Sequence, residues 1–246
     1  MRQMRSALFA IGLSMAMCVA AASAQAQDIG IDLGAGPTLS GRSVQLILLI
    51  TVLSLAPGLA IMVTCFPFVV TVLSILRQGI GLQQAPPNML IVSVALFITW
   101  YVMDPVFNEA WQNGIGPLTR EEIPFSEAFP LIVAPFRGFM ALRVDAGTFD
   151  QLASLRPDIS TVAIADAPLS LLVPSFMLSE VKLAFEIGFL VFLPFLIIDL
   201  VVAAVLMSMG MMMVPPAVVS LPFKLAFFVV ADGWSLITAA LVRSYF

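Results

Sequence analysis

The chain has 246 residues, of which 61% are hydrophobic and only 11% are charged, a composition well outside that of a soluble globular domain. The formal net charge is -4 and the eleven Lys and Arg residues are scattered singly. This distribution argues against a nucleic-acid partner, because nucleic-acid binding needs a basic patch or stripe. The apolar surface must be buried in lipid, in partner subunits or in both.

The first segment, residues 1–26, is predicted to be a cleaved secretory signal peptide. Two arginines near the start precede an apolar run from Ala7 to Ala22, and small residues at the spacing that signal peptidase needs follow. Cleavage would fall after Ala24 or Ala26, and an uncleaved anchor helix is the alternative. The mature chain would then begin outside the cytoplasm with a short periplasmic leader at residues 27–43.

The cysteine content leaves little room for redox chemistry. Cys18 would leave with the signal peptide, so Cys65 alone would remain and no intrachain disulfide could form. Cys65 lies in an apolar run beside Phe66 and Pro67, without a nearby cation to stabilise a thiolate. We therefore expect it to be a small packing residue.

Residues 44–107 are predicted to form a first hydrophobic helical hairpin. The stretch from Val44 to Leu76 carries no charge and is longer than the ~20 residues that a membrane helix needs. Pro57-Gly58 and Pro67 are places where this stretch can kink or break. Two helical pieces or one bent helix are therefore expected.

The two arms of this hairpin are joined by a loop that begins after Arg77 and runs to Asn88. Pro86 and Pro87 shape the loop because they remove backbone donors, and two glycines add turn freedom. A second apolar segment follows, from Met89 to Met103, and ends at Asp104-Pro105.

Residues 108–168 are predicted to form a small, polar, helical module on the periplasmic side. The stretch from Asp104 to Asp166 holds half of the charged residues of the chain, together with several prolines. Short helices joined by loops are the expected structure of this water-compatible part.

Residues 169–246 are predicted to form a second hydrophobic helical hairpin with a Met-rich loop at residues 207–213. Lys182 and Glu186 lie four residues apart within its first apolar run, so they would share one helical face and could form a salt bridge. Gly210 and Pro215-Pro216 break the apolar sequence after this run. A single last helix is predicted from Ala217 to Val242.

Five methionines are packed into seven positions of the loop, namely Met207, Met209, Met211, Met212 and Met213. The glycine and prolines around them should prevent a regular helix. Unbranched thioethers are apolar and adaptable, so a ring of them could close a pore and still reshape around a passing chain. Gap filling in the core of a helical hairpin is the alternative, and the residues alone leave both open.

Several ionisable side chains lie within or beside the apolar segments: Arg77, Glu180, Lys182, Glu186, Asp199, Lys224 and Asp232. Ionisable groups at membrane depth can form a proton or ion path, or they can pair with one another between subunits. Both signs of charge occur in similar number, which favours pairing over a relay. The sequence does not decide between these two roles.

The chain contains no histidine, so it cannot form an imidazole-based catalytic triad, a His-ligated zinc site or a His-ligated haem site. It also has no phosphate-binding glycine loop followed by a lysine. We therefore predict a protein that is not an enzyme, with no cofactor and no metal site. The fold class expected is all-α: a membrane-complex protein of long, kinked helical hairpins.

Several sequence motifs occur together in a fixed order. They are PSFMLSEVKLAFEIGFLVFLPFLIIDLVVAAVLMSMGMMMVPP at Pro174 to Pro216, LRQGIGLQQAPPN at Leu76 to Asn88, PFRGFM at Pro135 to Met140, and residues 103–106. With them the chain resembles the FliP/SctR family of type III export-gate proteins from about Val44 to the C-terminus. Leu82 and Ala85 replace threonines common in the family, and Gly138 lies inside PFRGFM.

The resemblance implies that five copies assemble with FliQ-like and FliR-like subunits into a closed helical gate, next to FlhB-like and FlhA-like export proteins. Unfolded flagellar substrates would pass through this gate at the bacterial inner membrane and the flagellar basal body, with much of the mature chain on the periplasmic side. It also implies that Met211, Met212 and Met213 seal the pore, and that the buried charges are subunit contacts.

Two alternatives from other functional classes are a proton-coupled secondary transporter that uses the buried carboxylates, and an assembly scaffold that does not conduct. A transporter should show inverted repeats, which this sequence lacks. The flanking charges also obey the positive-inside rule poorly. We therefore expect much of the hydrophobic surface to contact neighbouring subunits.

Overall fold

The computed structural model describes residues 46–48, 50–51, 54–55, 58, 60–81, 86–156, 162–211 and 213–246. The chain divides into two units, Met1–Thr51 and Val52–Phe246. Of the first unit, only the helical residues 46–48 and 50–51 are described. The predicted signal peptide and the leader lie outside the described residues.

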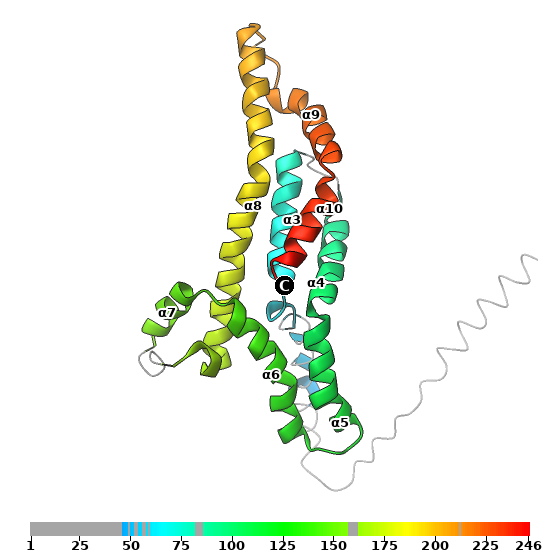
Figure 1. The fold of residues 1–246 in the computed structure, drawn as a ribbon, viewed down its shortest axis with the longest axis vertical. Coiled ribbons are helices and arrows are strands. Elements are labelled where there is room, and N and C mark those ends of the chain that lie inside the picture. Colours follow the sequence, from blue (N-terminus) through cyan, green and yellow to red (C-terminus); the bar gives the residue numbers. More distant parts are fainter. Residues whose placement is uncertain are drawn as a thin grey trace, which may run out of the picture. The chain divides into compact units, whose positions relative to one another are not determined.

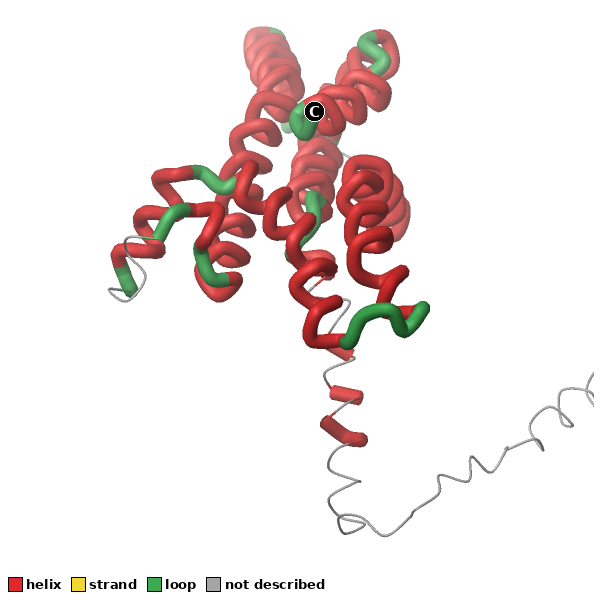
Figure 2. The backbone as a smooth tube through the Cα atoms, turned by 60° about the horizontal axis from the view of Figure 1, so that its bottom comes forward, coloured by secondary structure: helices red, strands yellow, loops and turns green. Residues whose placement is uncertain are grey.

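The described part of the chain is all helical, as predicted, and Figure 2 shows helices joined by turns without a strand. The second unit contains α3 (Phe66–Ile80), α4 (Asn88–Ala110), the π-helix η1 (Trp111–Ile115), α5 (Gly116–Thr119), α6 (Phe125–Arg143), α7 (Ala146–Ser154), the 3-10 helix η2 (Ile164–Asp166), α8 (Leu169–Ser208), α9 (Pro216–Val230) and α10 (Gly233–Arg243).

The core forms around α3, which packs along α8 and also against α4 (Figure 1). Its buried face is apolar and follows helical spacing, with Phe68, Val69, Val72, Leu73 and Leu76. The contact with α8 is close because α8 carries a glycine at position 188. A Cβ atom at Gly188 would lie 2.4 Å from Cδ1 of Ile75, so a side chain there would push the two helices apart.

The apolar stretch before α3 is interrupted by a turn at residues 63–65. α3 begins directly after it, with Pro67 in its first turn, where the missing N–H of proline costs no hydrogen bond. The helix ends at Gly81, whose φ of 85° is easily reached by glycine. Pro57 lies outside the described residues.

α4 is longer than the sequence indicates. The apolar segment ends at Asp104-Pro105, but the helix does not: α4 continues to Ala110 with Pro105 inside it. Met103, which is fully buried, anchors the turn before the proline. In the turn after it, the Asn108 amide donates a 3.0 Å hydrogen bond to Asp104. Tertiary packing on both sides of the proline therefore outweighs its tendency to end a helix.

The predicted last helix from Ala217 to Val242 is also wrong, because the structure has two helices in its place. α9 and α10 meet at an angle of 61°. Asp232, between them, has a left-handed backbone with φ of 47°. Gly233 follows, and a Cβ atom there would lie 2.2 Å from the ring of Phe228. The bend thus lets the start of α10 pack against Phe228. Helix propensities of the single residues do not reveal this bend.

A smaller core joins α6, α7 and the beginning of α8. It is built from buried apolar side chains, namely Met140, Phe149, Ala153, Ala167, Leu171, Leu172 and Phe176. Asp145 starts α7 as its N-cap and accepts a hydrogen bond from the Thr148 N–H.

Three helical segments of the described residues are long and apolar enough to cross a membrane: Asn88–Thr119, Phe125–Arg143 and Leu169–Ser208. The bent pair α9 and α10 would form a fourth if it acted as one span. This structure therefore has the helices of a membrane-associated protein by length and composition.

Candidate functional site

The methionine-rich segment forms the turn between α8 and α9. α8 ends at Ser208, and Gly210, with φ of 74°, takes the left-handed conformation that ends many helices. The N–H of Gly210 donates to the Met207 carbonyl at 3.0 Å, and the N–H of Met211 donates to the Leu206 carbonyl at 3.0 Å. This pair of bonds is a Schellman motif, so backbone hydrogen bonds fix the first half of the turn.

The second half of the turn leads into α9 through two prolines. Pro215 is the N-cap residue and Pro216 is the first residue of α9, positions where proline fits without loss of a helical hydrogen bond. Four of the five predicted gasket residues are described, and all four are exposed: Met207 by 60%, Met209 by 67%, Met211 by 41% and Met213 by 97%. Met212 lies outside the described residues.

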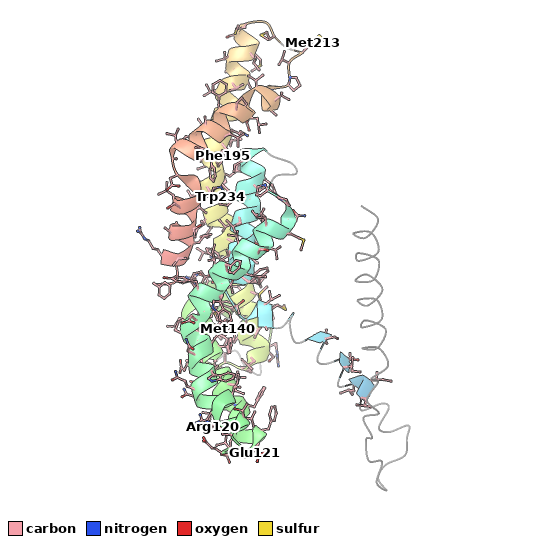
Figure 3. All side chains as sticks on the ribbon, turned by 90° about the vertical axis from the view of Figure 1, so that its right-hand side faces the viewer. Arg120, Glu121, Met140, Phe195, Met213 and Trp234 are labelled. Carbon is pink, nitrogen blue, oxygen red and sulfur yellow. The ribbon has the colours of Figure 1, made fainter. Side chains whose placement is uncertain are left out.

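Figure 3 shows Met213 at the very end of the α8 and α9 pair, away from the core. A fully exposed thioether gains nothing from the fold of the single chain. An apolar cavity of about 570 Å³ lies beside the turn, between α8 and α9. Its lining includes Val201, Val205, Met209, Met211 and Phe223. The methionines thus border a hollow apolar surface that is open to further apolar contacts.

Below the turn, a buried lysine joins three helices. Lys224 of α9 is 5% exposed. Its Nζ donates to Asp199 of α8 at 2.6 Å and to the carbonyl of Gly79 in α3 at 3.0 Å. Ser220 donates to the other oxygen of Asp199 at 2.6 Å. Every charge in this group has a partner within the chain, as burial requires.

A second charged group lies deeper in the fold. Glu180 of α8 is 1% exposed and forms an ion pair with Arg143 of α6, whose Nε donates to the carboxylate at 2.9 Å. The hydroxyl of Tyr245 donates to its other carboxylate oxygen. Arg143 also donates to the Ser244 carbonyl at 2.8 Å, and its guanidinium lies 4.1 Å from the centre of the Tyr245 ring. Burial and the adjacent Glu180 raise the pKa of Tyr245.

Together these contacts attach the C-terminal residues to the middle of the fold. The Tyr245 ring packs edge-on against Phe68 at 5.5 Å and stacks on Phe139 at 5.9 Å. Aromatic packing of this kind adds to the hydrogen bond and the cation contact. The C-terminus therefore bridges α3, α6 and α8.

The other predicted charged residues lie at the surface or near it. The predicted salt bridge between Lys182 and Glu186 is wrong, because Lys182 pairs instead with Asp145, at 3.4 Å. Glu186 is exposed and has no ion pair within 4.0 Å among the described residues. Asp232 is exposed at the bend between α9 and α10.

The loop at the end of α3 is described only in part. Arg77, half-buried, donates from Nη1 to the side-chain carbonyl of Asn88. Pro87 is the N-cap residue of α4, and Pro86 precedes it. The hydrogen bond between Arg77 and Asn88 therefore joins the end of α3 to the start of α4 across the loop.

Four partners of these charges were not among the residues predicted from the sequence: Arg143, Asp145, Ser220 and Tyr245. Arg143 and Asp145 lie in the polar stretch, where charge is ordinary, and Tyr245 is the penultimate residue. Spacing along the chain carries no signal for pairs separated by 37 and 65 residues. The one available signal was that a buried Glu180 requires a cation.

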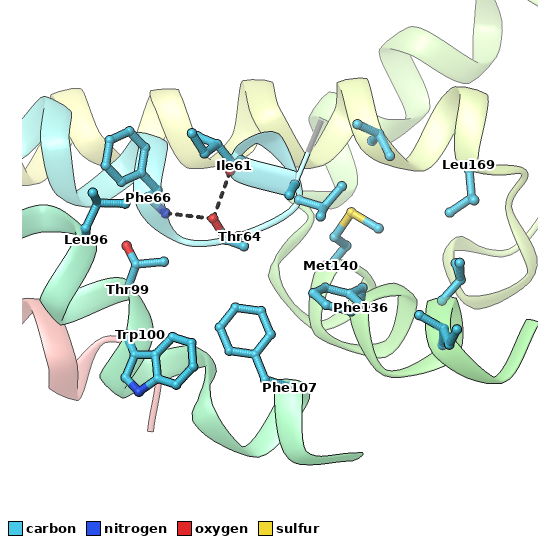
Figure 4. A pocket seen from close by; sticks show the side chains of 15 residues that line it. Ile61, Thr64, Phe66, Leu96, Thr99, Trp100, Phe107, Phe136, Met140 and Leu169 are labelled. Atoms are coloured by element: carbon cyan, nitrogen blue, oxygen red, sulfur yellow. Dashed lines mark hydrogen bonds between the residues drawn. The ribbon is translucent and has the colours of Figure 1, made fainter. Parts of the chain in front are cut away.

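A second cavity, of about 450 Å³, lies between the turn that precedes α3, the middle of α4, α6 and the start of α8. Figure 4 shows its apolar lining, which includes Leu96, Trp100, Phe107, Phe136 and Met140. Its polar edge is satisfied internally, since the hydroxyl of one lining threonine donates to a backbone carbonyl of the preceding turn. Thr99, the other lining threonine, donates to the Ala95 carbonyl. Apart from the two threonines and the indole N–H of Trp100 the lining side chains are apolar, so the cavity offers few polar groups with which to orient a substrate.

Cys65 is buried beside this cavity, and burial raises the pKa of its thiol to about 12. The thiolate needed for nucleophilic chemistry is therefore absent at neutral pH. Among the residues that the structure describes, no three His, Cys, Asp or Glu side chains gather in a way that could hold a metal ion.

Comparison with known proteins gives a consistent match along the chain. The model of the FliP family matches residues 49–241. The flagellar biosynthetic protein FliP of Caulobacter vibrioides is 48% identical over 242 residues, which cover 98% of this chain and 91% of that protein. Its counterparts in Rhizobium meliloti and Bacillus subtilis are 51% and 43% identical, covering 80% and 88% of this chain and 81% and 98% of their own.

Proposed function

This chain belongs to the FliP family, and from that premise we propose that it is a pore-forming subunit of the flagellar type III protein export gate. In this proposal the protein is not an enzyme. It conducts unfolded flagellar substrates across the bacterial inner membrane, as part of the flagellar basal body. The methionine turn acts as the gasket of the pore.

The observation that carries the proposal is the exposure of the methionine turn. Met213 is 97% exposed and Met209 is 67% exposed, although burial of each side chain would be favourable by about 1.5–3 kcal/mol. A backbone-fixed turn that presents flexible apolar side chains fits a ring in which several copies bring their turns together. Thioethers can then repack around a substrate chain of any sequence.

The second half of α8 supports an assembly of several subunits. Large apolar side chains on it are exposed, among them Phe189, Leu190, Ile197, Leu200 and Val201, each by 57–64%. An apolar surface of this extent is a sign of a protein or membrane contact. We propose that five copies associate through it, together with FliQ-like and FliR-like subunits, next to FlhB-like and FlhA-like proteins.

The buried charges support this pore over a proton-coupled transporter. A relay carboxylate must release and rebind protons, whereas Glu180 is held by Arg143 and Asp199 is held by Lys224. Pairs of this kind stabilise packing between helices. We therefore propose that these charges fix the position of α8 relative to α3, α6 and α9, within one subunit.

The gasket is tested by shortening its side chains in the intact complex. We expect replacement of Met209, Met211, Met212 and Met213 by Ala to let small ions leak across the membrane, because the apolar ring would no longer close. Replacement of the same four residues by Leu is the matched control, since Leu keeps most of the apolar volume and should leak far less. Ion conductance is measured on purified complexes in planar bilayers.

Two results would contradict parts of this proposal. An intact complex with four alanines that stays as tight as the native one would reject the gasket and favour a non-conducting scaffold. Loss of export in a Glu186→Gln variant whose complex still assembles would favour the transporter, since Glu186 is an exposed carboxylate without an ion pair within 4.0 Å among the described residues.

A further inference from the structure

The methionines of this chain differ widely in their access to solvent. Five of the 14 lie within seven positions of the methionine turn, and the four of these that the structure describes are all exposed. In the cores, Met103 and Met140 are 0% and 1% exposed. Figure 3 shows this contrast between Met213 at the tip and Met140 among the packed helices. Outside the turn, Met62 and Met89 are the exposed methionines of the described residues, so accessible sulfur is concentrated in the turn.

Exposure decides where a peroxide attacks such a chain. A lone pair of the thioether sulfur forms an S–O bond with hydrogen peroxide while the O–O bond breaks. The sulfur loses two electrons, and the proton on the transferred oxygen moves to the other oxygen, which leaves as water. A thiolate would compete for the oxidant, but Cys65 is buried and stays protonated at neutral pH. The exposed thioethers are therefore the first sulfur atoms that peroxide meets in the described part of the chain.

The fold around the turn offers no hydrogen-bond donor to a sulfoxide oxygen. Met209 and Met211 line the apolar cavity between α8 and α9, where the other lining side chains are aliphatic or aromatic. The backbone N–H groups of Met209, Gly210 and Met211 already donate to carbonyls at the end of α8. A sulfoxide is polar, and a polar group that is buried without a partner is unfavourable. The oxidised side chains must therefore turn toward water.

Oxidation thus removes the property on which a gasket depends. Thioethers close a pore because they are apolar and pack against one another without water. A sulfoxide needs water as its donor, so a ring of sulfoxides draws water into the closed pore. The backbone bonds that fix the turn are untouched, so the turn keeps its conformation while its side chains change in polarity.

We propose that the methionine turn is an oxidation site, at which peroxide converts exposed thioethers to sulfoxides and thereby opens the seal of the gate to water and small ions. This inference rests on the gasket within the proposed function. It adds a chemical modification that acts on the gasket while the subunits stay assembled.

Peptide mass spectrometry can locate the oxidation. The purified complex with the full-length chain is treated with hydrogen peroxide for increasing times, quenched with free methionine and digested. We expect the peptide that carries the turn to gain oxygen on the order of tenfold faster than the peptides that carry Met103 or Met140, because susceptibility follows exposure.

Ion conductance in planar bilayers tests the consequence of the oxidation. The conductance of the native complex should rise on the order of tenfold as sulfoxide appears in the turn, because an apolar seal becomes hydrated. A complex with Leu in place of Met209, Met211, Met212 and Met213 should not respond to peroxide, although every other methionine still meets the oxidant. Met89→Leu is the matched control outside the turn. It removes an exposed thioether, yet its complex should respond to peroxide as the native one does.

Three results would overturn the inference. Oxidation of Met103 and Met140 as fast as that of the turn would mean that the turn is not the preferred site. A native complex that carries sulfoxide in the turn and stays tight would show that oxidation does not open the seal. A four-leucine complex that leaks after peroxide would place the responsible methionine elsewhere.

The untreated four-alanine variant separates this inference from the proposed function. If that variant leaks and the oxidised native complex stays tight, the oxidation inference fails and the gasket stands. If the four-alanine variant is itself tight, the gasket fails, and the inference that depends on it fails with it.

Discussion

The two halves of α8 differ in how completely the chain buries them. The first half, to Gly188, contains eight buried residues, whereas the second half contains two, Phe195 and Leu206. The first half packs among α3, α6 and α7 (Figure 1), while the end of the second half has α9 as its neighbour. Both halves are strongly apolar in sequence.

The difference shows that an apolar sequence must be buried, but that the sequence does not reveal whether its own fold or another molecule buries it. In the first half the fold of the single chain satisfies much of this need, including the charge of Glu180, although Leu178 and Phe185 stay exposed. In the second half the need is left for other molecules, and the methionine turn extends it to the end of the hairpin. Mutations in the first half should therefore affect the stability of the chain, and those in the second half its assembly and function.

The sharpest test of this contrast is removal of the buried charge. Glu180→Gln should lower the free energy of unfolding by about 3 kcal/mol, because Arg143 would keep a largely buried charge without its counter-ion. Arg143 retains the Ser244 carbonyl and the Tyr245 ring, which keeps the effect at the lower end of the range for buried pairs. Thermal unfolding of the purified chain in detergent would measure it.

The matched control lies on the same helix six residues away. Glu186 is exposed, so Glu186→Gln should change the free energy of unfolding by no more than about 0.5 kcal/mol. Equal stability of the two variants would show that the first half of α8 does not depend on its buried charge, and the contrast between the halves would lose its main support.

The second half of α8 is linked to α3 and α9 through Lys224 and Asp199, and a second variant tests this link. Lys224→Met should cost about 2 kcal/mol, because Asp199 and the Gly79 carbonyl both lose a charged donor. The cost is smaller than for Glu180, since the Asp199 side chain is 34% exposed and can be hydrated. Unfolding in detergent measures this change too.

Lys182→Met is the control for this variant. Its pair with Asp145 joins side chains that are 54% and 42% exposed, so its loss should cost no more than about 0.5 kcal/mol. A larger loss for Lys182→Met than for Lys224→Met would mean that surface charge, and not the link between α3, α8 and α9, stabilises this end.

A smaller effect is expected at the close contact between α3 and α8. Gly188→Ala should cost about 1 kcal/mol, because the added methyl group would meet Ile75 and the side chain must shift. Gly138→Ala in α6 is the control. A Cβ atom at Gly138 meets nothing within 4 Å, so alanine should raise stability by up to about 1 kcal/mol through helix propensity. Opposite signs in unfolding measurements would confirm the packing, and equal signs would contradict it.

The sequence predicted the helical class, because long apolar runs punctuated by Pro and Gly leave few other structures. The path of the helices at two positions depends instead on tertiary contacts. Pro105 does not end α4, because Met103 anchors the preceding turn. The bend at Asp232 depends on packing between Gly233 and Phe228, which no local rule detects.

The charged residues show the same limit more clearly. A spacing of four predicted Lys182 with Glu186, a local pair, whereas the structure pairs Lys182 with Asp145. Glu180 and Lys224 were found as unusual residues, since charge within an apolar run is visible in a sequence. Their partners Arg143 and Asp199 are distant along the chain, so only the fold reveals that both pairs are closed within one subunit.

The weakest expected effect lies at the surface beside the first half of α8, where Asp145 caps α7. Hydrogen bonds from Thr148, and to a lesser extent Lys182, lower the pKa of Asp145 from its usual value of 3.8. A lowered pKa means that the charged carboxylate stabilises the folded chain above that value, and that this contribution is lost as the pH falls through the lowered pKa. The stability difference between the native chain and Asp145→Asn should therefore shrink on acidification below pH 3.8.

Unfolding temperatures measured across this acid range would show the effect as a converging pair of curves. Thr148→Val should move the loss of stability to higher pH more than Lys182→Met does, because the Thr148 hydroxyl donates at 2.7 Å and the lysine at 3.4 Å. If Lys182→Met had the larger effect, the ion pair to α8 would be the main stabiliser of Asp145. The polar cap of α7 would then depend on α8 in the same way as the buried charge of Glu180 depends on α6.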